Sequence, residues 1–449
     1  MVMATTATPS WSMARPPRCV AATASISPSP ARNTWRRGFW ISSVCRRRFR
    51  HSESPMFSMS RPRILLAASA LVAALLALAP AARAHALYDY GDRNATRIAA
   101  LLTPSAGRED GFHMVQIGDS HTAGDYFTDY LRTELQQRLG DGGIGWAMSM
   151  YASGQRLARV GYEQEGWELV NSRNAGEADY PFGGLIAQGT GVGGQLTLKT
   201  KSDDSPRQNI VMVVSQAAGD PPLHIIDADS EVLDVKARRA DGAWSEATFT
   251  ARLPFIVTTE GSPNTRIGGW WMRGERPGAI VSAVGINGSE LSQWDRWRSG
   301  WMDDLALGKP DLIALAYGTN EAFRTNLDPR EYRRTLETAI DQLRARFPRS
   351  AILIIGAPES LSSLKGGVCG QRAPSLNVVQ QEQRAVAKEK HTLYWDWQQA
   401  MGGGCSMRKW VAQNLARKDG VHFSQEGYER AAGDLLAGLL HLRGAAGSR

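Results

Sequence analysis

Cysteine is scarce in this sequence, and several common catalytic motifs are missing. The 449 residues contain four cysteines, of which only Cys369 and Cys405 lie after residue 84. Neither has the C-x-x-C spacing of a redox or zinc site. The sequence also lacks the H-E-x-x-H, P-loop and G-x-S-x-G motifs. It therefore gives no motif support to a metalloprotease, an NTPase or an ordinary α/β-hydrolase.

Acidic residues are nearly absent from the N-terminus. Residues 1–84 contain twelve arginines, no lysine and one acid, Glu53. Of the 52 basic and 44 acidic residues of the chain, 40 and 43 therefore fall in residues 85–449, which have a net charge of −3. This part has no excess positive charge to attract a polyanion, and we expect no nucleic-acid partner.

A single apolar run, Ile64 to Pro80, lies near the N-terminus. Basic residues precede it and Ala82-Arg83-Ala84 follows, a pattern typical of a secretory signal peptide over residues 56–84. The alternative is a membrane anchor, but about 17 residues is at the short limit for spanning a bilayer. We expect cleavage after Ala84 and a periplasmic or secreted protein without a stable membrane span.

The segment before this signal, residues 1–55, is rich in Ser, Pro and Arg. It is similar either to an organelle transit peptide or to an artefact of upstream translation. We favour the artefact, with a start at Met56 or Met59, because a signal peptide normally begins a chain.

Residues 85–449 contain two cysteines, Cys369 and Cys405, which is an even number. An exported protein is expected to reach an oxidising compartment. We therefore hypothesise that they form a disulfide. The alternative is a pair of separate buried thiols.

Continuous apolar strands alternate with amphipathic helices over most of residues 85–449. This alternation predicts an α/β fold with a parallel sheet that helices cover on both faces. The expected strands are 113–118, 279–284, 311–317, 351–356 and 391–395, and the expected helices are 127–139, 329–347, 376–390 and the segment after Ser424.

The middle of the chain has a different composition. Residues 165–275 contain many Gly, Thr and Val and few helical patterns, which predicts an all-β insertion. The α/β domain would then comprise residues 85–164 and 276–449. Within the insertion, the expected strands are 195–201, 210–215, 223–226 and 247–253.

Four short motifs carry the candidate chemistry. Gly118-Asp119-Ser120-His121 stands between the first strand and a helix, where backbone N–H groups can favour developing negative charge. Asp419-Gly420-Val421-His422 places an acid three residues before a histidine, a spacing that can orient an imidazole as a base for a serine. Each motif by itself also fits an ordinary turn.

The other two motifs follow apolar strands. Val284 to Ser289 contains Gly285 and Gly288, which would allow the backbone to approach a ligand. Gly318-Thr319-Asn320-Glu321 places an Asn where its amide N–H can reach a substrate oxygen. Open α/β sheets build their sites at the carboxyl ends of strands, so we expect these motifs to converge there.

In this order, the four motifs resemble the blocks of the SGNH (GDSL-like) hydrolase family. The segment GDSHTAGDYFTDYL, together with the β insertion, is similar to periplasmic peptidoglycan O-acetylesterases in particular. The resemblance implies a three-layer α/β/α domain that an inserted, carbohydrate-binding-like sandwich interrupts. It implies a serine esterase that needs neither a metal nor a cofactor.

The resemblance also implies residue roles. Ser120 would be the nucleophile, His422 the general base and then acid, and Asp419 the residue that orients His422. The oxyanion hole would comprise the backbone N–H groups of Ser120 and Gly288 and the side-chain amide of Asn320, with Gly285 as the alternative to Gly288. His121 stands where many relatives carry an apolar residue, and we do not expect it to be the base.

The expected reaction is removal of O-acetyl groups from a cell-envelope glycan, most readily peptidoglycan. Two alternatives stay open: a glycan O-acetyltransferase with the same triad, and a non-catalytic glycan-binding protein. In the insertion, Trp244, Trp270 and Trp271 either offer flat faces to sugar rings or pack between the domains. Trp294, Trp297 and Trp301 recur at helical spacing and are expected to form a packed face.

Overall fold

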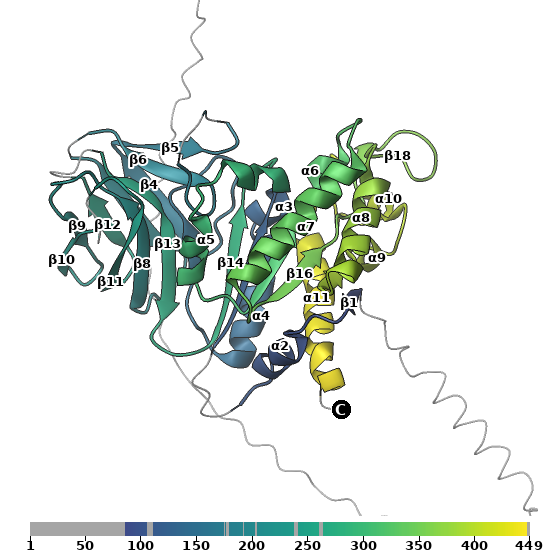
Figure 1. Cartoon of the computed structure of the whole chain (residues 1–449), viewed down its shortest axis with the longest axis horizontal. Coiled ribbons are helices and arrows are strands. Elements are labelled where there is room, and N and C mark those ends of the chain that lie inside the picture. The colour runs from purple at the N-terminus through teal and green to yellow at the C-terminus, as the bar shows by residue number, and fades with distance from the viewer. Residues whose placement is uncertain are drawn as a thin grey trace, which may run out of the picture. The chain divides into compact units, whose positions relative to one another are not determined.

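The computed structural model describes most of the chain after residue 85 (Figure 1). The predicted extension (1–55) and signal peptide (56–84) lie outside the described residues. No helix in the described part is both long and apolar enough to cross a membrane. The described residues are 86–446 without 106–110, 175, 177–178, 192, 203, 238–240 and 260–263.

A six-stranded sheet forms the centre of the α/β part (Figure 1). Neighbouring strands run parallel except at one edge, where β1 pairs antiparallel with β19. The predicted parallel sheet is confirmed. In spatial order the strands are β1 (Leu87–Asp89), β19 (Leu393–Trp395), β16 (Ala351–Ile355), β15 (Leu312–Ala316), β2 (Phe112–Gly118) and β14 (Ala279–Gly285).

Helices cover both faces of this sheet, which is why its strands lack polar alternation. Successive residues of β2 belong to different cores: Met114 packs with α2, α4 and α11, whereas Val115 packs with α5, α7 and α8. The first layer comprises α2 (Ala95–Leu101), α4 (Tyr126–Leu139), α9 (Trp397–Ala400), α10 (Ser406–Ala412) and α11 (Gln425–Ala446). The second comprises α5 (Trp301–Leu307), α7 (Pro329–Arg346) and α8 (Leu376–Glu389).

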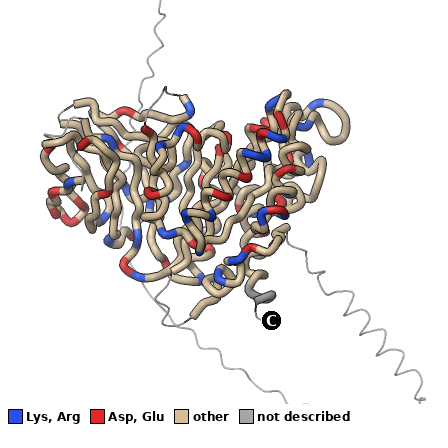
Figure 2. Tube along the Cα trace, viewed as in Figure 1, with Lys and Arg blue, Asp and Glu red and all other residues tan. Residues whose placement is uncertain are grey.

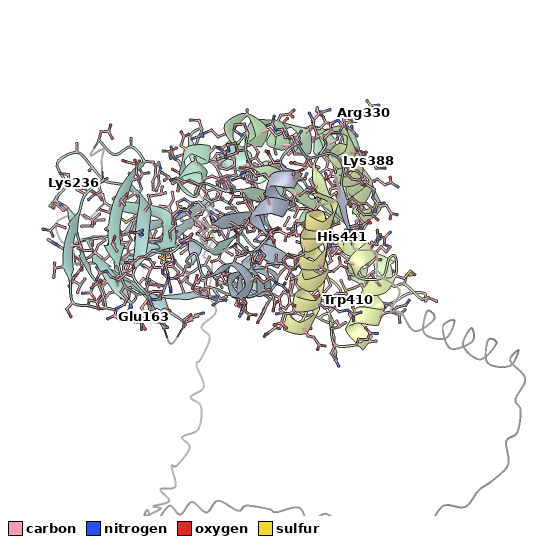
Figure 3. All side chains as sticks on the ribbon, turned by 90° about the horizontal axis from the view of Figure 1, so that it is seen from below. Glu163, Lys236, Arg330, Lys388, Trp410 and His441 are labelled. Atoms are coloured by element: carbon pink, nitrogen blue, oxygen red, sulfur yellow. A yellow bond between two sulfur atoms is a disulfide. The ribbon has the colours of Figure 1, made fainter. Side chains whose placement is uncertain are left out.

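Two antiparallel sheets share one core and form the β-sandwich. Figure 3 shows this part with Glu163 and Lys236 on it, away from Trp410 and His441 of the α/β part. One sheet contains β10 (Val232–Val235), β9 (Leu223–Ile226), β12 (Phe255–Thr258), β7 (Gln195–Thr200) and β4 (Val160–Glu165). The other contains β11 (Ser245–Ala251), β8 (Gln208–Ser215), β13 (Arg266–Gly274), β6 (Leu185–Gly189) and β5 (Trp167–Asn171), with β3 (Gly145–Met148) beside β13. Strand β3 and all of β4 except its last residue, Glu165, thus lie before residue 165, where the insertion was predicted to begin.

The tryptophans of the insertion are packed and not displayed. Trp244, Trp270 and Trp271 expose 6%, 0% and 1% of their surface, which leaves no flat face for a sugar ring. The indole N–H of Trp271 donates to the carbonyl of Asp304 in α5 at 2.8 Å, so Trp271 joins the sandwich to the α/β part. The predicted packed face of Trp294, Trp297 and Trp301 is confirmed by their burial and ring contacts.

Candidate active site

Three of the four motifs converge because they follow three adjacent strands. The order β15-β2-β14 places the segments after Ala316, Gly118 and Gly285 at one edge of the sheet. The fourth motif lies in the loop that precedes α11. The site therefore has a strand side, which carries Ser120, and a loop side, which carries His422.

Ser120 begins a short helix, α3 (Ser120–Ala123), directly after β2. A Cβ atom at Gly118 would lie 2.4 Å from the carbonyl oxygen of Ala316. Only glycine therefore allows the end of β2 to lie this close to the end of β15. The carboxylate of Asp119 caps α3 by accepting the N–H of His121 at 2.9 Å. Its complete burial raises the pKa of Asp119 to about 7.

Ser120, His422 and Asp419 form one continuous hydrogen-bonded chain. Ser120 Oγ lies 2.9 Å from His422 Nε2, and His422 Nδ1 lies 2.9 Å from Asp419 Oδ2. The structure thus brings together the three residues that the motifs predicted as a triad. A base aligned this way can take the serine proton while the carboxylate holds its other nitrogen.

The second oxygen of Asp419 accepts the backbone N–H groups of Val421 and His422, each at 2.9 Å. Partial burial by itself would raise the pKa of this carboxyl. The two N–H donors and the His422 ring outweigh burial and lower the pKa of Asp419. Asp419 therefore stays ionised and can hold the proton on Nδ1 of His422.

A disulfide-linked segment supports the loop of Asp419. The N–H of Leu361, in β17 (Leu361–Ser363), donates to the carbonyl of Gly420 at 2.8 Å. Strand β17 pairs with β18 (Gln371–Arg372) beside the Cys369–Cys405 disulfide, which confirms the predicted pairing. The loop side is thus tied to a covalent cross-link.

The segment after β14 turns at Gly288, whose φ of +73° favours glycine. Within the described part of the chain, the backbone N–H groups of Ser120 and Gly288 donate to no acceptor. Asn320, in α6 (Thr319–Ala322), donates one amide N–H to the carbonyl of Ser289 at 2.8 Å and has a second to offer. Three donors for a substrate oxygen are therefore available near Ser120.

Gly285 is placed differently from Gly288. A Cβ atom at Gly285 would lie 2.2 Å from the backbone nitrogen of Ala123, so this glycine packs against α3. Its carbonyl accepts the side-chain N–H of Gln155 at 2.9 Å. Gly288, in contrast, lines the same cavity as Ser120 and His422.

Glu321 links its own motif to the 3₁₀ helix that follows the second motif, a role that sequence reasoning missed. Its carboxylate accepts the N–H of Gly318 and the N–H of Leu291 in η1 (Leu291–Arg296), both at 3.0 Å. Its burial raises the pKa of Glu321 to about 7. The E of the G-T-N-E motif was the available signal, because a capping carboxylate three residues after a turn glycine is a known local pattern.

A cavity of about 520 Å³ contains these groups. Ser120, Gly288, Asn320 and His422 line it, and none of its lining residues is acidic. Its other side chains, unforeseen from the sequence, include Tyr126, Tyr428, Arg156, Arg173 and Arg417. The arginines belong to none of the four motifs, so no local pattern singled them out.

His121 lies behind the triad and does not face Ser120 as a base. Its Nδ1 is 2.9 Å from the hydroxyl of Tyr428, and its ring centroid is 5.4 Å from that of His422. Complete burial lowers the pKa of His121 to about 3, so the ring is neutral at physiological pH.

Two protein-family models match adjacent parts of this chain. A family model described as "Peptidoglycan O-acetylesterase, N-terminal" matches residues 142–256, and the "GDSL-like Lipase/Acylhydrolase family" model matches residues 256–430. A solved peptidoglycan O-acetylesterase structure is 40% identical over 80% of this chain and 99% of its own, with a TM-score of 0.73. A putative GDSL-like lipase from Parabacteroides merdae is 18% identical over 37% of this chain and 74% of its own, with a TM-score of 0.30. A search of curated proteins found no match.

The chain therefore belongs to the GDSL-like (SGNH) hydrolases and, among them, to the peptidoglycan O-acetylesterase family. It is an esterase with an SGNH α/β fold and an inserted β domain.

Proposed function

We propose that this esterase removes O-acetyl groups from peptidoglycan and that Ser120, His422 and Asp419 perform the reaction. The observation that carries the proposal is the unbroken chain Ser120 Oγ–His422 Nε2 and His422 Nδ1–Asp419 Oδ2, with both distances 2.9 Å. The 40% identical solved relative supports the substrate class.

In the first step Ser120 Oγ attacks the acetyl carbonyl carbon while His422 Nε2 takes the hydroxyl proton. Asp419 holds the proton on His422 Nδ1 and stabilises the imidazolium that forms. The carbonyl π electrons move to the oxygen, which becomes the tetrahedral oxyanion. The N–H groups of Ser120 and Gly288 and the amide of Asn320 stabilise this charge.

Collapse of the tetrahedral intermediate breaks the bond between the acetyl carbon and the sugar oxygen. His422 returns its proton to that oxygen, so the glycan leaves as an alcohol and acetyl stays on Ser120. A water molecule, deprotonated by His422, then attacks the acetyl-serine. Acetate leaves and Ser120 regains its proton.

The proposed site of action is the periplasm or the outside of the cell. The apolar run at residues 64–80 with its Ala-Arg-Ala sequence supports export. The Cys369–Cys405 disulfide supports an oxidising compartment.

The test measures acetate release from O-acetylated peptidoglycan by the purified protein, beside hydrolysis of a small aryl acetate. Ser120→Ala is expected to abolish both activities, whereas Ser292→Ala, at an exposed serine of η1, keeps them. If the protein hydrolyses the aryl acetate but releases no acetate from peptidoglycan, the assignment of peptidoglycan as the substrate would be overturned. Acetate release from peptidoglycan by Ser120→Ala at the wild-type rate would overturn the assignment of Ser120 as nucleophile.

A further inference from the structure

The three proposed oxyanion donors follow three strands of which two are not neighbours. Asn320 follows β15, Ser120 follows β2 and Gly288 follows β14, and the order in the sheet is β15-β2-β14. Ladder hydrogen bonds join β2 to each of the other strands, but β2 separates β15 from β14. The spacing between Asn320 and Gly288 therefore depends on contacts beyond the strand ends.

One such contact is made by Asn320 itself. Its side-chain amide donates to the carbonyl of Ser289 at 2.8 Å. The backbone N–H of Ser289 donates to the carbonyl of Ile286 at 3.1 Å, which closes a turn that contains Gly288. Asn320 is therefore bonded directly to the turn that carries the second proposed donor.

Glu321 provides a second connection between the same two segments. Figure 2 shows Asp and Glu interspersed with Lys and Arg along the chain. Glu321, in contrast, is only 3% exposed, and each of its carboxylate oxygens accepts a backbone N–H group at 3.0 Å. One N–H belongs to Gly318, at the start of the turn that carries Asn320, and the other belongs to Leu291, two residues after Ser289. The carboxylate thus joins the segment after β15 to the segment after β14.

A third contact between these segments is weaker. Arg324 Nε donates to Glu290 Oε1 at 3.0 Å, but the arginine side chain is 49% exposed, and an ion pair in contact with water contributes little. Loss of the Glu321 carboxylate would instead leave two buried N–H groups without their acceptor, which is costly. Of the two contacts made by carboxylates, that of Glu321 therefore holds the segments more firmly.

We propose that Glu321 is a positioning residue for the oxyanion hole, because its carboxylate fixes Asn320 and Gly288 at the spacing at which both donate to one oxygen. Glu321 is not among the residues that line the cavity, so it acts through the two donors. The inference rests on the proposed function and deepens it. A misplacement of about 1 Å at such a site costs on the order of 100-fold in rate.

The experiment is a double-mutant cycle of Glu321→Gln and Asn320→Ala, with kcat and KM measured on an aryl acetate. Glutamine has one acceptor oxygen, so one of the two N–H groups loses its partner. Glu321→Gln is expected to lower kcat about 10- to 100-fold and to change KM less than about 2-fold. In the Asn320→Ala background, where one of the positioned donors is already gone, the loss should be at least about 3-fold smaller. Measurement at pH 8 keeps Glu321 ionised, because burial raises its pKa to about 7.

Asp92→Asn is the matched control. Asp92 is also buried, and its carboxylate accepts the N–H groups of Asn94 and Ile352 at 2.9 and 3.1 Å. Ile352 lies near the start of β16, whereas Ser120 follows the end of the parallel strand β2. Asp92→Asn should therefore lower the free energy of unfolding in denaturant and keep the wild-type kcat per folded molecule. Near-UV circular dichroism gives the folded fraction of each variant.

A wild-type kcat in folded Glu321→Gln would overturn the inference, and so would equal fold-losses of kcat in the two backgrounds. A rise in KM with unchanged kcat would also overturn it, because Glu321 would then act on substrate binding. Glu321→Asp keeps the charge but shortens the reach, and it should show the same loss of kcat without a change in KM if Glu321→Gln does not fold. The proposed function would fail by different results: hydrolysis retained by Ser120→Ala, or no acetate released from peptidoglycan by the wild-type protein.

Discussion

The two sides of the cavity are built in different ways. Ser120, Gly288 and Asn320 each follow a strand of the buried sheet, whose ladder hydrogen bonds fix the positions of the strand ends. Asp419 and His422 lie in a loop, with side chains that are 44% and 34% exposed. The groups that receive the substrate oxygen are therefore held by the sheet, and the groups that move the proton are held by a few side contacts.

Specific contacts hold the loop in place of the hydrogen bonds that join neighbouring strands in the sheet. They include Leu361 N–H to Gly420, Arg417 N–H to the carbonyl of His422, and two N–H bonds to the carboxylate of Asp419. The strand side should therefore tolerate local damage to the loop, whereas the loop side depends on the disulfide-linked segment beside it.

The largest expected effect is a loss of kcat, and it should differ between the two catalytic residues of the loop side. We expect His422→Ala to lower kcat by about 10⁴- to 10⁶-fold, because it removes the base whose Nε2 lies 2.9 Å from Ser120 Oγ. We expect Asp419→Ala to cost about 10²- to 10⁴-fold, less than His422→Ala, because its exposed carboxylate is partly replaced by solvent. Steady-state kinetics on an aryl acetate measures both, and a larger loss in Asp419→Ala would contradict the assigned roles.

On the strand side the expected effect is smaller. Asn320→Ala should lower kcat by about 10²- to 10³-fold with little change in KM. The substitution removes one donor to the oxyanion, and this charge develops only in the transition state. Asn209→Ala, at an exposed position of β8, is the control. A rise in KM with unchanged kcat would assign Asn320 to ground-state binding.

The disulfide provides a direct test of the comparison. Cys369→Ser with Cys405→Ser opens a loop of sequence separation 36, which should lower the free energy of unfolding by roughly 4 kcal/mol in the chain-entropy model. Denaturant unfolding measures this loss. Hydrogen exchange should accelerate at residues 419–422 and stay slow at 112–118. Equal acceleration of both segments would show that the loop side is no more dependent on the cross-link.

The smallest effect concerns the buried histidine behind the triad. His121 has a folded-state pKa of about 3, below the usual value of 6.5. Between these two pH values the ring is protonated in the unfolded chain and neutral in the folded chain. This contribution to stability is lost as pH falls from about 6.5 towards 3.

His121→Phe should therefore reduce the loss of unfolding free energy between pH 7 and pH 5 by roughly 2 kcal/mol relative to wild type. Urea unfolding at the two pH values measures the difference. His224→Phe, at a half-buried histidine of β9 that pairs with Asp234, controls for the loss of a histidine. The same pH slope in His121→Phe and wild type would show that His121 takes up its proton in the folded state.

The sequence by itself determined the elements that local patterns encode. Apolar strands such as 351–355 and helices such as 329–346, with Asp328 as cap and Pro329 at its start, were predicted almost to the residue. The roles of Ser120, Asp419 and His422 were expected because the four motifs, in their order, resemble the blocks of the SGNH hydrolases, whereas each motif by itself also fits a turn. The disulfide was predicted because only two cysteines remained to pair.

Only the tertiary structure decided what each side chain faces. Arg173 gives no signal in sequence, since its place over Gly288 depends on how the sandwich packs on the α/β part. Trp270 and Trp271 could have been displayed or buried, and the contacts of β13 with its neighbours bury them. Periodicity reports burial along one element, whereas the lining of a cavity between elements depends on packing that is distant in sequence.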